Sequence, residues 1–175
     1  AYAVDDSHLY FVNAVDQCIY KLALDEAQNP VSITKPGLRF ADLVIDQTRQ
    51  RLIAVCETHH EDREPENTLV GISIANGEVK TLASGADFYA YPRISPDQKK
   101  LCWIEWQHPN MPWDSTQLWQ ANISADCLMD KTLIAGSAGT DKQEAIFQPS
   151  WSPDNQLYYV SDKNNWWNIY RADGQ

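Results

Sequence analysis

A run of histidines and carboxylates contains the side chains that proteins most often use to bind metals. It reads Glu57-Thr58-His59-His60-Glu61-Asp62-Arg63-Glu64-Pro65-Glu66. Imidazole and carboxylate groups are common zinc ligands. Adjacent histidines in an extended segment point in opposite directions, however, and the run lacks the helical His-Glu-x-x-His spacing of zinc peptidases. We therefore predict a solvated acidic loop, with no metal site and no cofactor.

A second group of residues combines aromatic rings with an imidazole, an amide and a carboxylate. In one interpretation its rings line a binding wall, and Asp114 pairs with the amine of a ligand or with an arginine of a partner domain. In the other, Pro109, Pro112 and the two Trp rings fold the segment on itself, and His108 bonds to the backbone. Both interpretations stay open. The group consists of Trp106, His108, Asn110, Trp113 and Asp114.

Trp166 and Trp167 form another aromatic pair near the end of the sequence. Trp167 is predicted to begin a strand and to be packed. Trp166 is predicted to cover either a loop face or an interface, so it joins the candidate site residues.

The elements that must position these residues are strands that recur along the chain. Four similar strand segments are anchored by leucines at intervals of 43, 49 and 56 residues. In the two clearest copies Ser-Pro-Asp precedes the strand, and this tripeptide favours a tight turn because Pro fixes φ and Asp bonds back to the backbone. A second, alternating strand follows in each unit, as a sheet with one buried face requires. The anchoring leucines are Leu9, Leu52, Leu101 and Leu157.

This pattern predicts an all-β fold, a partial β-propeller of about three to four four-stranded antiparallel blades. The predicted blades cover residues 1–36, 37–86, 87–139 and 140–175 of a single domain. The first blade is expected to lack its inner strand and the last to lack its outer strand. Unpaired sheet edges attract other strands, so self-association through open blade edges is expected. The connections between the second and third strands of each blade are the long ones, and they contain the candidate residues.

Composition narrows the classes of partner. The 24 acidic and 14 basic side chains give a net charge of −10, which repels phosphate backbones, so we expect no nucleic-acid partner. No apolar run approaches the roughly 20 residues that cross a bilayer, and we expect no membrane partner. The cysteines form no Cys-x-x-Cys pair and are predicted to be free structural thiols, which favours a cytoplasmic location. They are Cys18, Cys56, Cys102 and Cys127.

Four segments together resemble the N-terminal propeller of the prolyl oligopeptidase family of serine peptidases, most closely its acylaminoacyl-peptidase and dipeptidyl-aminopeptidase-like branch. The resemblance covers nearly the whole chain. Family hairpins commonly continue Ser-Pro-Asp-Gly, whereas Gln98 and Asn155 stand at that position here, which leaves the turn type open. The segments are the two Ser-Pro-Asp hairpins, Trp106–Asp114 with Leu118-Trp119, and Ser161–Tyr170.

The resemblance implies a non-catalytic propeller that gates substrates for an α/β-hydrolase domain of the same parent chain, in an enzyme acting on small peptides. In that family the hydrolase domain supplies the nucleophilic serine in a Gly-x-Ser-x-Gly turn. No such motif occurs here, and the nearest imitation, Gly136-Ser137-Ala138-Gly139, has the wrong spacing. We therefore predict no catalytic residue in this chain. The alternatives are a stand-alone interaction propeller like TolB and a carbohydrate-active propeller such as a pectin-fragment lyase.

Overall fold

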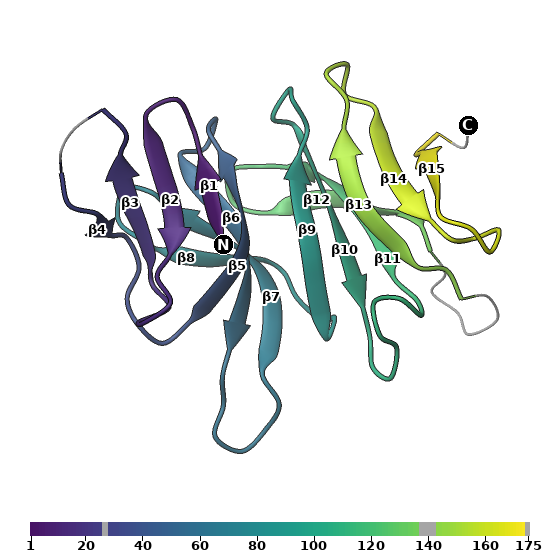
Figure 1. Cartoon of the computed structure of the whole chain (residues 1–175), viewed down its shortest axis with the longest axis horizontal. Coiled ribbons are helices and arrows are strands. Elements are labelled where there is room, and N and C mark those ends of the chain that lie inside the picture. The colour runs from purple at the N-terminus through teal and green to yellow at the C-terminus, as the bar shows by residue number, and fades with distance from the viewer. Residues whose placement is uncertain (26–27, 137–142, 174–175) are drawn as a thin grey trace. The chain divides into compact units, whose positions relative to one another are not determined.

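The computed structural model describes residues 1–25, 28–136 and 143–173. These residues form strands, turns and loops without a helix (Figure 1). The described part of the chain therefore contains no helix with the length and apolarity needed to span a membrane. The predicted all-β class is confirmed.

Residues 1–85 form one compact unit of two antiparallel sheets, in which neighbouring strands follow chain order. The first sheet contains β1 (Tyr2–Val4), β2 (His8–Val12), β3 (Ile19–Ala23) and β4 (Val31–Ser32). The second contains β5 (Arg39–Asp46), β6 (Arg51–Thr58), β7 (Glu66–Ser73) and β8 (Val79–Ala83). The prediction that the first blade lacks its inner strand is wrong, because the short strand β1 completes that sheet.

Residues 86–175 form the second compact unit, again with two antiparallel sheets in chain order. One contains β9 (Phe88–Ile94), β10 (Lys100–Trp106), β11 (Gln117–Ile123) and β12 (Leu128–Ala135). The other contains β13 (Ile146–Trp151), β14 (Leu157–Ser161) and β15 (Asn168–Arg171). Among the described residues this last sheet has three strands, as predicted, and the outer edge of β15 is unpaired there. Self-association through that edge stays a prediction.

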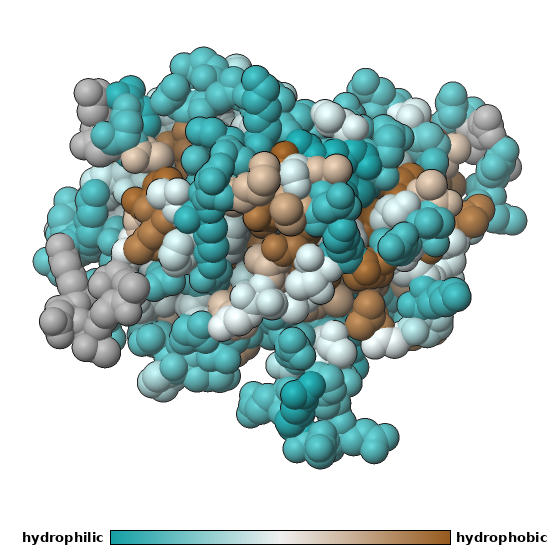
Figure 2. Space-filling model, turned by 180° about the vertical axis from the view of Figure 1, so that it is seen from behind, coloured by the Kyte–Doolittle hydropathy of each residue, from teal (hydrophilic) through white to brown (hydrophobic). Residues whose placement is uncertain are grey.

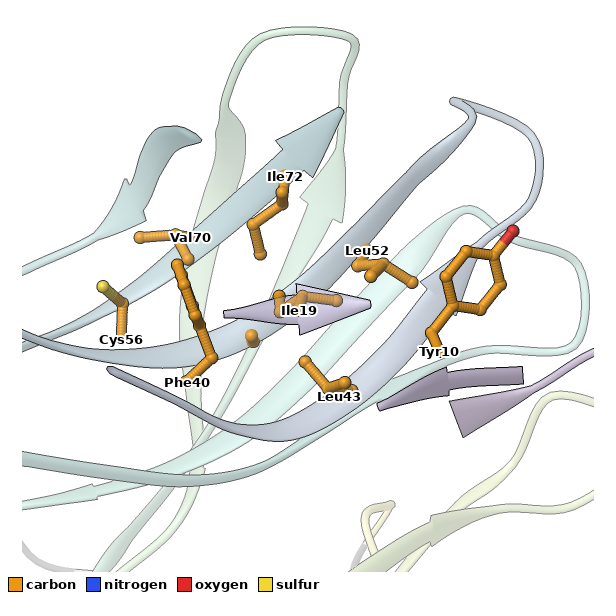
Figure 3. Close-up of a cluster of buried hydrophobic side chains, with 9 residues drawn as sticks. Tyr10, Ile19, Phe40, Leu43, Leu52, Cys56, Val70 and Ile72 are labelled. Carbon is orange, nitrogen blue, oxygen red and sulfur yellow. The ribbon is translucent and has the colours of Figure 1, made fainter. Parts of the chain in front are cut away.

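Each unit has its own hydrophobic core. In the first, β6 is the central strand, and Leu52, Ala54 and Cys56 face Val70 and Ile72 together with side chains of β2, β3 and β5 (Figure 3). In the second, the core joins both sheets through Cys102, Ile104, Leu118, Ile146, Leu157 and Tyr159. The spacing of two between core residues of one strand reflects the alternation of side chains across a sheet.

The four cysteines are free, as predicted, and only Cys127 is exposed. Burial raises the pKa of the Cys56 thiol to about 11 and that of Cys102 to about 12. Both thiols therefore stay protonated at neutral pH and act as small apolar side chains.

Both Ser-Pro-Asp turns adopt the same geometry. The hydroxyls of Ser95 and Ser152 each donate to the aspartate two residues later, at 2.6 Å. Gln98 and Asn155 take left-handed conformations, with φ of 60° and 63°. The turns thus keep the backbone that glycine would adopt, although neither residue is glycine.

A β-bulge recurs in the first strand of the second, third and fourth sheets. The pairing of β5 with β6, β9 with β10 and β13 with β14 shifts register partway along each strand. One residue within each irregular stretch has a left-handed conformation: Asp42, Tyr91 and Gln148 have φ of 52°, 53° and 51°. Such bulges bend the strand and re-aim the side chains beyond them.

Candidate functional site

Two loops at one end of the second unit contain all the predicted site residues except Trp106, which ends β10. They connect β10 to β11 (residues 107–116) and β14 to β15 (residues 162–167), and we call them the aromatic loops. The segment before β13 lies between them. The Thr116 backbone N–H donates to the carbonyl of Glu144 at 3.0 Å, and the Ala145 N–H donates to the Asp162 carboxylate at 2.8 Å. The two aromatic loops therefore lie on either side of the segment that contains Glu144 and Ala145.

The turns at the opposite end of this unit confirm that arrangement. The Asp97 N–H donates to the Asn155 side chain at 3.0 Å, so the two Ser-Pro-Asp turns are neighbours. The Trp151 indole N–H also donates to the carbonyl of Arg93 at 3.0 Å. Strands β10 and β14 thus begin side by side at this end of the unit, and the loops that follow them lie at the other end.

The first aromatic loop is braced against the start of β9. Trp106 is half-buried and stacks on Phe88, with ring centroids 5.1 Å apart. The His108 ring meets Phe88 edge-on at 4.9 Å. The backbone N–H of His108 donates to the Asp87 carboxylate at 2.8 Å, and the Asp87 N–H donates to the Gln107 side chain at 3.0 Å. Trp106 and His108 therefore position the loop.

Asp114 closes a turn inside the same loop. Its carboxylate accepts the Met111 N–H at 2.9 Å, and its own N–H donates back to the Met111 carbonyl at 2.9 Å. The Asn110 N–H donates to the carbonyl of Gln107 at 3.0 Å. These contacts turn the loop back on itself, while Trp113 does not pack into it, because 61% of its surface is exposed. Both interpretations of this group stay predictions.

The second aromatic loop is held by asparagine side chains. The Asn168 amide donates to the Asn164 side chain at 3.0 Å and to the Trp166 carbonyl at 2.9 Å. Trp166 is 76% exposed. The prediction for Trp167 is wrong: it precedes β15 instead of beginning it, and it is 52% exposed. Its ring approaches Phe147 edge-on at 5.5 Å.

The aromatic loops thus present exposed apolar side chains on a hydrogen-bonded frame. Indole faces bind apolar groups by burial and cations through the ring quadrupole. Such a surface is suited to binding a ligand with an apolar or a positively charged group. Residues 137–139 of the Gly136–Gly139 segment lie outside the described residues. The exposed apolar side chains are Met111, Trp113, Trp166 and Trp167.

Sequence reasoning missed Asp87, Phe88 and Phe147, which support the aromatic loops from strand ends. Phe88 begins an aromatic run, Phe88-Tyr89-Ala90-Tyr91, which signals a strand but not a site. The pairing of Trp106 with Phe88 across β10 and β9 depends on the strand register, which the run itself does not reveal.

The histidine-rich loop between β6 and β7 is built differently. His59 contacts Glu57, whereas His60 contacts Arg63 at 3.0 Å, so the adjacent rings have separate partners. The loop is hydrophilic throughout (Figure 2). Within the described residues no three His, Cys, Asp or Glu side chains are grouped to hold a metal ion.

Comparison with solved structures places this fold among the β-propellers of peptidases. The chain is similar over nearly its whole length to the β-propeller portion of puromycin-hydrolysing enzymes. A puromycin-hydrolysing peptidase of Mycobacterium tuberculosis matches 97% of this chain at 28% identity, with a TM-score of 0.83. A puromycin hydrolase variant, S511A complexed with PGG, matches 98% at 27% identity, with a TM-score of 0.86. The resemblance to the propeller of the prolyl oligopeptidase family is thereby confirmed.

The match covers 28% of each of these two chains, so this chain spans little more than a quarter of their length. TolB from Acinetobacter baumannii also matches, at 14% identity over 94% of this chain with a TM-score of 0.62, which shows a shared fold alone. No protein-family model and no curated protein sequence matches the chain.

Proposed function

We propose that this chain is the substrate-gating propeller of a cytoplasmic serine peptidase that acts on small peptides. In this proposal the aromatic loops face the active site of an α/β-hydrolase domain in the same parent polypeptide. The proposal is supported above all by the rigid display of Trp113 and Trp166, which are exposed although the loops around them are extensively hydrogen-bonded. Large exposed indoles on a fixed frame are typical of binding surfaces.

The similarity to puromycin-hydrolysing peptidases supports the same class of substrate. Those enzymes are named for hydrolysing puromycin. A surface of indoles in a chain of net charge −10 suits a substrate with an apolar group and a positively charged amine. Asp114 acts in this proposal by holding the turn below Trp113, and no catalytic residue is assigned to the chain.

The first test is the reading frame that encodes this chain. A following domain with a Gly-x-Ser-x-Gly turn supports the peptidase, whereas a stop codon directly after residue 175 favours the alternative of a stand-alone, TolB-like interaction propeller. The purified 175-residue chain is expected to hydrolyse neither puromycin nor aminoacyl reporter substrates. Hydrolysis by this chain alone would overturn the assignment.

The second test measures gating in the full polypeptide. Trp113→Ala and Trp166→Ala are expected to raise KM for a small peptide while kcat stays near wild type, because binding contacts are lost and the chemistry is not. Tyr2→Ala removes an aromatic side chain that is 72% exposed in the other unit, and it serves as the matched control. Unchanged kinetics in both tryptophan variants would contradict the proposed role of the aromatic loops.

A further inference from the structure

A polar hollow lies in the first unit, far in sequence from the aromatic loops. It has a volume of about 410 Å³ and lies where the β1–β2 turn approaches the turn containing Gln47 and Gln50. A second hollow of about 410 Å³ shares Ser7, His8 and Lys21 with it and extends toward Asp25. Small-molecule sites commonly occupy roughly 300–1,000 Å³. The two hollows are therefore large enough for a small ligand.

Lys21 stands on the shared wall of both hollows. It is paired directly with Tyr10 across β3 and β2, so the two side chains leave the same face of the first sheet. Tyr10 is 3% exposed and belongs to the core, so this face packs toward the second sheet. Within the described part of the chain, no carboxylate lies within ion-pair distance of the half-buried Lys21 ammonium. The Lys21 side chain lines the hollow, so an anionic ligand group has room beside its ammonium.

Two carboxylates line the same hollow as Lys21. Asp5 and Asp6 form the β1–β2 turn at one side. Asp5 is fixed there, because its carboxylate accepts the N–H groups of Ser7 at 2.9 Å and His8 at 2.7 Å. Burial opposes ionisation of Asp5, but these bonds outweigh it and lower its pKa, so the carboxylate is charged at neutral pH.

The hollow has a positive charge on one side and negative charges on the other, and this arrangement indicates the class of ligand. A simple anion near Lys21 would be repelled by Asp5 and Asp6, and a simple cation near the aspartates would be repelled by Lys21. We propose that this hollow binds a small zwitterion, a free α-amino acid or a dipeptide. The ligand carboxylate pairs with the Lys21 ammonium, and the ligand ammonium faces the Asp5–Asp6 turn. This site is independent of the proposed gating function.

The test is calorimetric titration of the 175-residue chain with glycylglycine. Saturable binding is expected, and Lys21→Met is expected to weaken it at least about tenfold, which corresponds to about 1.4 kcal/mol. Methionine keeps the apolar stem and removes the charge. Lys35→Met is the matched control, because Lys35 is an exposed lysine between β4 and β5 that does not line the hollow. Binding is expected to be unchanged in this control.

Two further titrations separate the parts of the proposal. Acetate and N-acetylglycinamide each lack one or both charges of the dipeptide, and both are expected to bind far more weakly. Acetate binding as tightly as glycylglycine would overturn the zwitterion assignment. Absence of saturable binding, or equal binding by the Lys21→Met variant with an unchanged circular dichroism spectrum, would overturn the site itself.

Discussion

The loops at 59–65 and 107–116 connect equivalent strands of their sheets, yet they are built on different principles. The first is rich in His, Glu and Asp, and its contacts are ion pairs and hydrogen bonds among largely exposed side chains, such as Arg63 with Glu66 at 3.7 Å. The second is held by ring contacts and by backbone N–H groups that donate to carboxylates. Only the second offers large apolar side chains on a fixed frame.

This difference shows that the types of residue in a loop and the way the fold holds them are separate indications of function. Exposed ion pairs contribute little because water screens the charges and the long side chains lose entropy when they are fixed. Ring stacking combined with satisfied backbone groups fixes a loop more firmly. A loop with reactive side chains can therefore be a solvated connection, while a loop with few ionisable groups is the better candidate for binding.

The largest expected effect on the unfolding free energy is at Phe88, whose ring supports the first aromatic loop. Phe88→Ala removes the stacking partner of Trp106 and the edge-on contact of His108, and we expect the second unit to lose about 2 kcal/mol of unfolding free energy. Urea unfolding followed by Trp fluorescence measures the change. In a double-mutant cycle with Trp106→Ala, the two losses should be less than additive. Full additivity would show that the rings do not brace each other.

The contact between Trp106 and Phe88 also shows which part of the structure could not be predicted from the sequence. The strands, their order and the Ser-Pro-Asp turns could be predicted, because proline, aspartate and the alternation of apolar residues act locally. Before the bulge Leu101 pairs with Ile94, and with that register continued Trp106 would pair with Tyr89. The bulge at Tyr91 shifts the pairing by one residue, so that Phe88 meets Trp106 instead. Tyrosine has no preference for the left-handed φ that this bulge requires.

Trp113 and Trp167 show the same limit. The exposure of Trp113 follows from contacts between Asp114 and the Met111 N–H, which proline spacing suggested but did not specify. The placement of Trp167 outside β15 depends on asparagine side chains that end the loop, and an aromatic residue beside a strand pattern gave no sign of it. Strand register and the side-chain hydrogen bonds that end a loop are set only when the sheet is assembled, so local sequence patterns do not predict them.

An intermediate effect is expected for the turn below Trp113. Asp114→Ala removes the acceptor of the Met111 N–H, and we expect a loss of no more than about 1 kcal/mol of unfolding free energy, because that bond is exposed. Asp114→Asn keeps an oxygen acceptor and should lose less, with Trp113 fluorescence close to wild type. In the full polypeptide, loss of peptide turnover by Asp114→Asn at unchanged stability would contradict the positioning role and favour a direct pairing of this carboxylate with substrate.

The smallest effect is expected in the histidine-rich loop. Replacing His59 and His60 together by Ala removes exposed contacts to Glu57 and Arg63, and the unfolding free energy should change by no more than about 0.5 kcal/mol. Zinc chloride should not raise the thermal unfolding midpoint of the wild-type chain, since a ligand stabilises a fold only when it binds the native state more tightly than the unfolded one. A rise that grows with zinc concentration and disappears in the double variant would show that this loop binds metal. The distinction drawn between the two loops would then be wrong, because exposed reactive side chains without a fixed frame would form a metal site.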